Sequence, residues 1–271
     1  MRKLTKLWVL GIVVVGLVAT GCSSDSSSSS DKSTTTTTTA KVTGAIKVSA
    51  AASLTEAFAR IGTDFTAANP GATVTFNPGS STTLATQIQQ TNGVGIDTFA
   101  SADDANMANL VNANLVDGDP VIFARNQLVI VTKQGNPENV KTLADLANLN
   151  VVSLCGATVP CGKYVAQALQ TAGVTIPETK VTRGVDVKGT LAAVTTGDAQ
   201  AAIVYVTDAK SVPSGSIATV EIPDAQNVIA NYPIATLISS TNKPGSKAFI
   251  DYVMSSKGQA TLRSFGFLPP T

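Results

Sequence analysis

From about residue 45 to the C-terminus, apolar residues follow two spacings in turn. Short apolar runs such as 201–206 suit buried strands, whereas segments such as 54–65 place apolar residues at every third or fourth position, as amphipathic helices do. Strands are predicted at 45–51, 73–76, 97–101, 123–132, 150–154, from 181, 201–206 and 234–238. Helices are predicted at 53–65, from 81, from 103, around 143–146, at 162–171, from 187 and at 246–265.

This alternation of strands and helices is typical of an α/β protein with largely parallel sheets. Roughly 220 residues belong to the alternating part, which is large for one such sheet, and two lobes are therefore expected. Ser53 is the expected N-cap of the first helix, because Ser53 and Glu56 form an S-x-x-E capping box, and Thr207 is an expected N-cap after the strand 201–206.

The first residues have the pattern of an export signal. Three basic residues, Arg2, Lys3 and Lys6, precede an apolar run at 7–20. A run of this length is too short to span a bilayer, which needs about 20 residues, but it suits the apolar part of a signal peptide. We therefore predict a signal peptide at 1–21.

The residues around the expected cleavage site resemble a bacterial lipobox, in which the signal is removed before a cysteine that receives lipid. Here that residue is Cys22, after the small residues Ala19-Thr20-Gly21. Residues 22–44 are rich in Ser and Thr, cannot bury apolar surface, and are predicted to be a tether. The alternative is an ordinary cleavable signal followed by an incidental cysteine.

Charge and cysteine content narrow the possible partners. The chain has 271 residues and a formal net charge of +1, without a long basic stretch, so nucleic acid is not an expected partner. Outside a reducing cytosol, Cys155 and Cys161 are predicted to form a disulfide, with two buried free thiols as the alternative. Direct coordination of a metal ion is not expected, because the chain has no histidine.

Three loops end a strand and begin a helix with small or hydroxylic residues, at 51–53, 79–81 and 160–162. The first turn of a helix has free backbone N–H groups and the positive end of the helix dipole, so such loops can hold an anion without a charged side chain. Taken singly, Ser53 and Ser81 could equally be ordinary helix caps. Several such loops around one cleft would provide a set of neutral donors for a dianion.

Ordered segments across residues 46–268 resemble the periplasmic molybdate-binding proteins of ABC importers. The segments that resemble this family are 50–58, 79–88, 97–103, 123–129, 159–164, 186–189, 203–209, 232–235 and 265–267. The resemblance implies a two-lobed periplasmic-binding-protein fold of type II, with the ligand in a cleft between the lobes. Lobe I would comprise 45–123 plus 232–271, and lobe II would comprise 124–231.

The resemblance also implies a ligand-binding set for the oxyanion. Ser53 and Ser81 would donate through their hydroxyls and backbone N–H groups, Cys161 and Val187 through their backbone N–H groups, and Tyr205 through its phenol. The family usually has Ala at position 161, and a bridge from Cys161 to Cys155 would then fix the loop that presents this N–H. Without the resemblance, a buried core tyrosine would be the simpler reading of Tyr205.

The function implied is capture of molybdate or tungstate by an extracytoplasmic, lipid-anchored and monomeric protein, which delivers the anion to an ABC permease in the membrane. Sulfate or another small oxyanion is the alternative ligand. No cofactor is implied, and the metal would be held only as its oxyanion. An enzyme is not expected, because the chain has neither a histidine for a Ser-His pair nor a G-x-S-x-G motif.

Overall fold

The computed structural model describes residues 42–270 of the chain. The predicted signal peptide 1–21, Cys22 and nearly all of the predicted tether 22–44 lie outside these residues. The described residues belong to one compact unit, whose first strand begins at Thr43. None of the helices within residues 42–270 has both the length and the apolar character needed to cross a bilayer.

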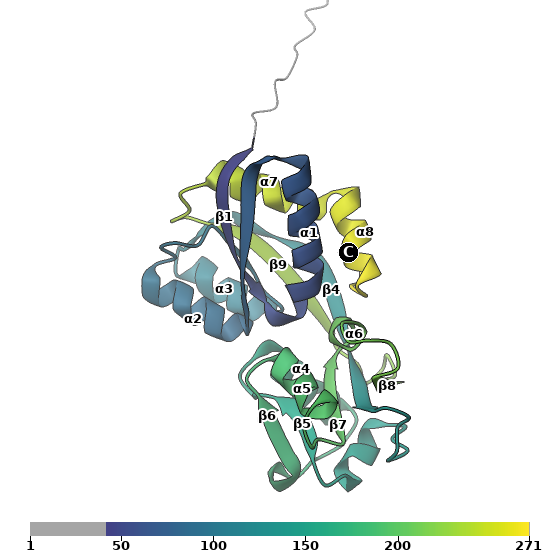
Figure 1. Ribbon diagram of the computed structural model, residues 1–271. Coiled ribbons are helices and arrows are strands. Elements are labelled where there is room, and N and C mark those ends of the chain that lie inside the picture. Colours follow the sequence, from purple (N-terminus) through teal and green to yellow (C-terminus); the bar gives the residue numbers. More distant parts are fainter. Residues whose placement is uncertain (1–41, 271) are drawn as a thin grey trace, which may run out of the picture. The chain divides into compact units, whose positions relative to one another are not determined.

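The first lobe is built on a sheet with the strand order β2-β1-β3-β9-β4. Strands β1, β2 and β3 are parallel, and β9 joins β3 in the antiparallel direction. Helices α1, α7 and α8 contact one another beside the sheet, and α2 and α3 form a separate pair (Figure 1). The elements of this lobe are β1 (Thr43–Ala51), η1 (Ala52–Leu54), α1 (Thr55–Ala68), β2 (Gly71–Gly79), α2 (Ser81–Thr91), β3 (Thr98–Ala100), α3 (Asp104–Asn112), α7 (Lys243–Met254) and α8 (Ser256–Ser264).

Aromatic rings from distant parts of the sequence close the core of the first lobe. The rings of Phe58 and Phe65 on α1 lie 5.8 and 5.6 Å from the ring of Phe249 on α7, both with edge-to-face geometry. Phe76 on β2 packs against Phe58 and Phe249. Such pairs stabilise the core beyond their burial, by roughly 0.5–1.5 kcal/mol each.

Two strands run through both lobes, namely β4 (Val116–Lys133) and β9 (Ile229–Leu237). They pair in the antiparallel direction from Val116/Leu237 to Gln127/Ile229, with register shifts on the way. From Leu128 onwards, β4 pairs with β7 instead. These crossing strands therefore join the two lobes by continuous backbone hydrogen bonding.

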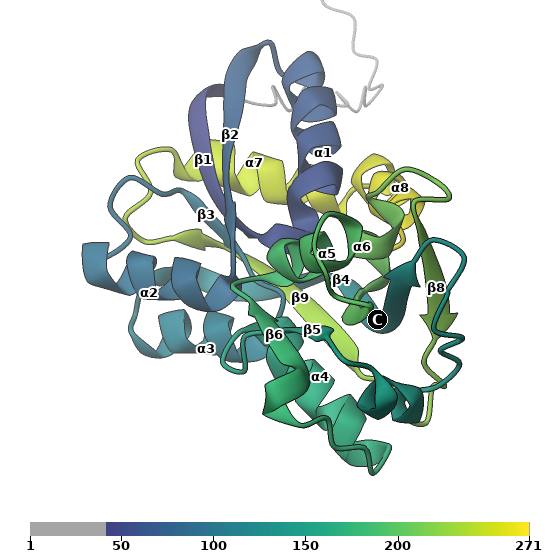
Figure 2. The ribbon, with the colours of Figure 1, turned by 60° about the horizontal axis from the view of Figure 1, so that its bottom comes forward.

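The second lobe continues the sheet with the order β4-β7-β5-β6, and β8 pairs with the other edge of β4. Figure 2 shows α4, α5 and α6 arranged around these strands. The elements of this lobe are η2 (Leu143–Asn148), β5 (Val152–Cys155), α4 (Pro160–Thr171), η3 (Glu178–Lys180), β6 (Val181–Gly184), α5 (Val187–Thr195), β7 (Ala201–Tyr205), α6 (Val206–Lys210) and β8 (Ile217–Glu221).

Two of the predictions about the fold need correction. The sheets are mixed rather than largely parallel, because β9 and β4 return antiparallel to their neighbours. The helix predicted at 246–265 is two helices, because Ser255 leaves the helical conformation. The Ser255 side chain instead accepts a hydrogen bond from the N–H of Gly258 and caps α8.

Candidate functional site

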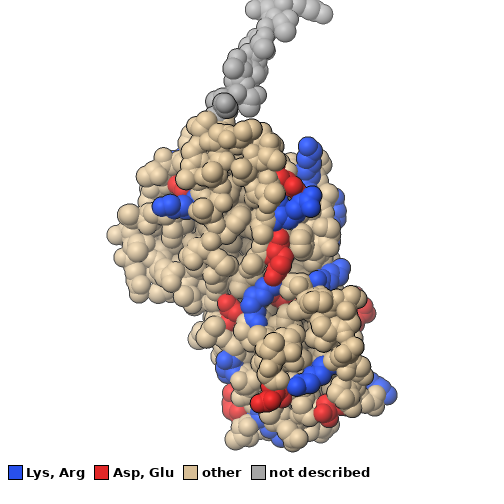
Figure 3. Space-filling view, viewed as in Figure 1, with Lys and Arg blue, Asp and Glu red and all other residues tan. Residues whose placement is uncertain are grey.

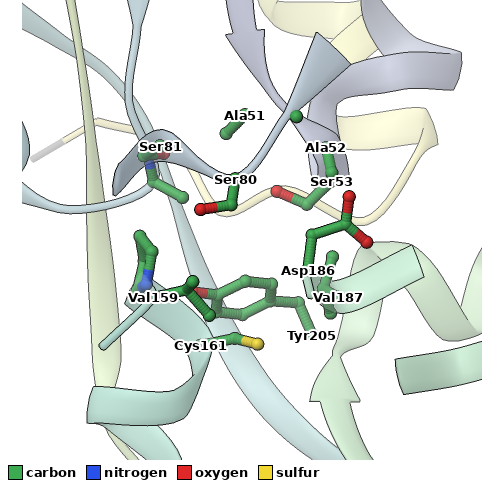
Figure 4. Close-up of a pocket in the computed structure, with 13 residues that line it drawn as sticks. Ala51, Ala52, Ser53, Ser80, Ser81, Val159, Cys161, Asp186, Val187 and Tyr205 are labelled. Carbon is green, nitrogen blue, oxygen red and sulfur yellow. The ribbon is translucent and has the colours of Figure 1, made fainter. Parts of the chain in front are cut away.

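The three strand-to-helix loops singled out from the sequence meet at one small cavity, of about 20 Å³ (Figure 4). Loops of the first lobe form one wall, and the starts of α4 and α5 with the end of β7 form the other. The lining residues are Ala51, Ala52, Ser53, Gly79, Ser80, Ser81, Ala102, Val159, Pro160, Cys161, Asp186, Val187 and Tyr205. The cavity therefore brings together all five residues predicted to bind the ligand.

The backbone donors of the second lobe come from two helix starts. Val187 is the first residue of α5, and Cys161 is the second residue of α4, after Pro160. N–H groups in the first turn of a helix have no acceptor within that helix, so both can donate into the cavity. The side chains of these residues give no hint of this role, and only the helix starts identify them.

Ser81 differs from the ordinary cap that it could have been. The N-cap of α2 is Ser80, whose hydroxyl accepts a hydrogen bond from Thr83 N–H at 3.3 Å. The Ser81 oxygen accepts from the backbone N–H of Ala102 at 2.9 Å. This leaves the hydrogen of the Ser81 hydroxyl available for an acceptor in the cavity. Ser80 also lines the cavity and was missed, although its position before a helix is a recognisable signal.

The predicted capping box at the first helix is wrong. Ser53 lies inside the short 3-10 helix η1, and the residue before α1 is Leu54, which makes no side-chain cap. The Ser53 oxygen lies 2.8 Å from the hydroxyl of Tyr232, far away in the sequence. Glu56 does not reach back to a backbone N–H but forms an ion pair with Lys188. A tertiary contact has thus replaced the local cap.

Tyr205 is almost completely buried and forms one side of the cavity. In Figure 4 its ring lies opposite Ser53 and Ser80. Within residues 42–270 its hydroxyl has no hydrogen-bond partner, which is costly for a buried group. Burial raises the pKa of the phenol, so it remains a protonated donor. The orphaned hydroxyl is therefore suited to an acceptor that enters the cavity.

The expected N-cap at Thr207 is also wrong. The N-cap of α6 is Tyr205, and Thr207 lies within the helix. The Thr207 oxygen accepts a hydrogen bond from Asn126 Nδ2 at 2.9 Å. Thr207 therefore supports the strand that carries Asn126 instead of starting the helix.

Within the described part of the chain, the lining of this cavity contains no cationic side chain, so its donors are hydroxyl and backbone groups. Asp186 does line it, which adds a carboxylate to a site expected to contain only donors. One oxygen of Asp186 caps α5 by accepting from Gly189 N–H at 2.9 Å. In Figure 3, acidic and basic side chains are interspersed on the visible face. Among residues 42–270, His, Cys, Asp and Glu side chains do not gather in groups of three that could hold a metal ion.

The predicted disulfide between Cys155 and Cys161 is present, with the two Cα atoms 5.9 Å apart. It joins the end of β5 to the first turn of α4. The Thr190 hydroxyl on α5 lies 3.2 Å from the sulfur of Cys155, while its hydrogen goes to the carbonyl oxygen of Asp186 at 2.8 Å. The bridge is thus connected to both helices whose first turns face the cavity.

Two α/β lobes that share a pair of crossing strands and enclose a small cavity of hydrogen-bond donors define a solute-binding protein. The sequence model of the bacterial extracellular solute-binding proteins matches residues 46–268, and the chain belongs to this family. The predicted class of fold and the predicted kind of family are both confirmed.

One related protein and two solved structures agree with this family assignment. The chain is 38% identical to the molybdate-binding protein ModA of Mycobacterium tuberculosis, over 97% of this chain and 96% of that protein. The Azotobacter vinelandii periplasmic molybdate-binding protein superposes with a TM-score of 0.75 at 19% identity, over 83% of this chain and 100% of that chain. The sulfate-binding protein SubI of M. tuberculosis superposes with a TM-score of 0.74 at 20% identity, over 83% and 86% of the two chains. At these identities, the two solved structures share the fold.

Proposed function

We propose that the chain captures molybdate, or its close analogue tungstate, and delivers it to the permease of an ABC importer. The observation that carries the proposal is the buried hydroxyl of Tyr205, which has no partner in residues 42–270 and faces two helix starts and two serines. The identity with a molybdate-binding protein over nearly the whole chain supports the choice of anion. The ligand set is Ser53, Ser81, Cys161, Val187 and Tyr205.

The donors of the site favour an anion that carries no proton at neutral pH. Hydrogen phosphate would bring a proton into the cavity, where Asp186 is the one carboxylate of the lining. Wherever that proton does not reach Asp186, leaving it without an acceptor costs about 1–3 kcal/mol. Sulfate carries no proton, so its exclusion depends on size. A ring of donors spaced for a larger tetrahedral anion would hold sulfate with longer and weaker hydrogen bonds.

The proposed arrangement has no catalytic step and no cofactor. Two lobes, at 45–123 plus 232–271 and at 124–231, close on the anion by bending of the crossing strands. The metal is held only through its oxygens, and the closed form is what the permease recognises. A lipid on Cys22 and the tether 22–44 keep the monomeric protein at the extracytoplasmic face of the membrane.

Isothermal titration calorimetry of the purified protein with molybdate, tungstate, sulfate and hydrogen phosphate tests this function. We expect tight binding of molybdate or tungstate, with sulfate much weaker and hydrogen phosphate weakest. Tight binding of sulfate alone would replace the proposal by the sulfate alternative, and a lack of heat with both metal oxyanions would refute it. Mass spectrometry of the membrane fraction would show whether Cys22 carries lipid.

A further inference from the structure

Asp208 on α6 carries a buried carboxyl group close to the contact between the lobes. Its side chain is fully buried, and neither of its oxygens has a hydrogen-bond partner among residues 42–270. Lys188 Nζ on α5 lies 3.3 Å from Asp208 Oδ1 and forms an ion pair with it. A buried carboxylate without hydrogen bonds is costly, so the charged form of Asp208 depends on how fully Lys188 compensates it.

The hydrogens of Lys188 are directed to other acceptors. An ammonium group has three hydrogens. Lys188 Nζ donates to the two carboxylate oxygens of Glu56 on α1, at 2.9 and 2.7 Å, and to Ser211 Oγ at 3.0 Å. The Ser211 hydroxyl donates its own hydrogen to the carbonyl oxygen of Asp208, so its oxygen can accept from Lys188. All three hydrogens of Lys188 are therefore used, and two of them go to a residue of the first lobe.

Opening of the lobes would change this balance. When α1 moves away from α5, Glu56 leaves Lys188, and two hydrogens of the ammonium group become free to turn to Asp208. Hydrogen bonds from a cation stabilise the ionised carboxylate. Closure returns these hydrogens to Glu56 and brings the negative charge of Glu56 close to Asp208. Open lobes therefore favour the ionised carboxylate, and closed lobes favour the protonated carboxyl group.

The other titratable groups that face Asp208 do not oppose this effect. In the closed lobes, burial raises the pKa of Asp208 to about 7. The negative charge of Asp186, at the start of α5, also raises this pKa. Tyr205 at the end of β7 and Tyr232 on β9 stay protonated, because burial raises the pKa of each phenol. Asp186 and Tyr205 line the cavity, so a dianion held there adds further negative charge on this side of Asp208.

We propose that closure of the lobes on the anion is coupled to the uptake of one proton by Asp208, while Lys188 passes from Asp208 to Glu56. The proposal rests on the proposed function in taking the cavity as an anion site on which the lobes close. The proton comes from the solvent and forms an O–H bond with a carboxylate oxygen of Asp208. When the lobes open and the anion leaves, this bond breaks and the proton returns to the solvent.

Calorimetric titration with molybdate in buffers of different ionisation enthalpy measures the number of protons taken up per anion. Molybdate carries no proton between about pH 6 and pH 8, so the protein receives any proton that the buffer loses. We expect an uptake that approaches one proton at about pH 6 and falls towards zero at about pH 8. One coupled proton changes affinity by at most tenfold per pH unit, so the affinity should fall by about tenfold over this range. Binding without proton uptake would overturn the proposal.

Four variants assign the proton to one group. Asp208→Asn keeps the size of the side chain without its charge, and should bind without proton uptake and with the same affinity at both pH values. Glu56→Gln should reduce the uptake, because Lys188 then stays with Asp208 in the closed lobes. Asp64→Asn removes a charge from the same helix as Glu56 and is the matched control, with uptake as in the wild type. If the uptake persists in Asp208→Asn and disappears in Asp186→Asn, the proton belongs to Asp186 and the proposal is wrong.

The outcomes separate this proposal from the proposed function. If the wild-type protein binds molybdate tightly without taking up a proton, the proposed function stands and the coupling is refuted. If molybdate fails to bind and sulfate binds, the proposed function is refuted. Proton uptake with sulfate, which also carries no proton at these pH values, would then support the coupling, and its absence would refute it. A protein that binds neither anion would overturn both.

Discussion

Two ion pairs join the lobes in the described residues: Lys163 with Asp103 at 3.5 Å, and the shorter pair of Lys188 with Glu56. Removing the shorter pair measures how much closure of the lobes depends on it. Lys188 Nζ on α5 lies 2.7 and 2.9 Å from the two carboxylate oxygens of Glu56 on α1. Lys188 is also held from its own lobe, by Ser211 Oγ at 3.0 Å and by Asp208 Oδ1 at 3.3 Å. Glu56→Gln removes the charge of the first lobe and leaves the second-lobe contacts in place.

The expected magnitude follows from exposure and distance. Two unit charges at about 3 Å attract by about 1.4 kcal/mol in water and more at lower dielectric constants. The Lys188 and Glu56 side chains are 27% and 38% exposed, so solvent and lost side-chain freedom offset much of this attraction. A net contribution of roughly 0.5–1 kcal/mol remains, which corresponds to about a two- to fivefold loss of anion affinity.

The control is Asp64→Asn, which removes the same charge from the same helix. Among the residues that the structure describes, Asp64 forms an ion pair with Arg60 alone, at 2.8 Å, and both lie on α1 in the first lobe. Calorimetry should give a larger Kd, and so weaker binding, for Glu56→Gln and an unchanged Kd for Asp64→Asn. Labelled molybdate should be released faster from Glu56→Gln than from wild-type protein, and at the wild-type rate from Asp64→Asn. Equal affinities for the two variants would show that the Lys188–Glu56 pair does not stabilise the closed form.

Three other predictions concern the cavity and the residues behind it. Tyr205→Phe should weaken anion binding by about 10- to 100-fold in calorimetry, since a hydrogen bond to a charged group is lost, without lowering the unfolding free energy of the empty protein. Replacing both Cys155 and Cys161 by Ser should lower the unfolding free energy by about 2 kcal/mol in urea and weaken binding; unchanged affinity would show that the bridge does not position the loop. Burial raises the pKa of the Asp208 carboxyl to about 7. The negative charges of Glu56 and Asp186 also raise this pKa, whereas Lys188 lowers it. Because the folded state holds this proton more tightly than the unfolded state, Asp208 contributes stability at pH 4 that is lost as pH rises to 7, by at most about 4 kcal/mol. Urea unfolding of Asp208→Asn should lack this decline, and identical pH slopes for the two proteins would contradict it.

The periodicity of the sequence located most strands and helices, but it could not give their direction. Apolar spacing is the same in parallel and antiparallel strands, so the reversal at β9 and β4 was not visible. The break at Ser255 was missed for a similar reason, since apolar residues continue with helical spacing on both sides of it.

The residues of the candidate site were predicted well from the family resemblance. Local capping patterns predicted their roles poorly. Ser53 has the local pattern of a cap, but its hydroxyl instead bonds to Tyr232, which lies 179 positions away. Backbone donors such as Val187 and Cys161 leave no mark in side-chain chemistry, and they were found only by comparison with a family. Asp186 was placed correctly before α5, yet its presence in the cavity depends on how the lobes meet.

The first lobe is discontinuous in the sequence, and this affects the order in which it can fold. Its core needs Phe249 on α7 to pack against Phe58 and Phe65 on α1, and β9 must pair with β3. A chain that emerges N-terminus first has made α1 and β3 long before these partners exist. The second lobe, by contrast, is contiguous, and its strands can assemble earlier. The aromatic side chains of α1 therefore stay exposed until the segment with β9 and α7 has been made. During this interval a chaperone or holdase could bind the exposed side chains.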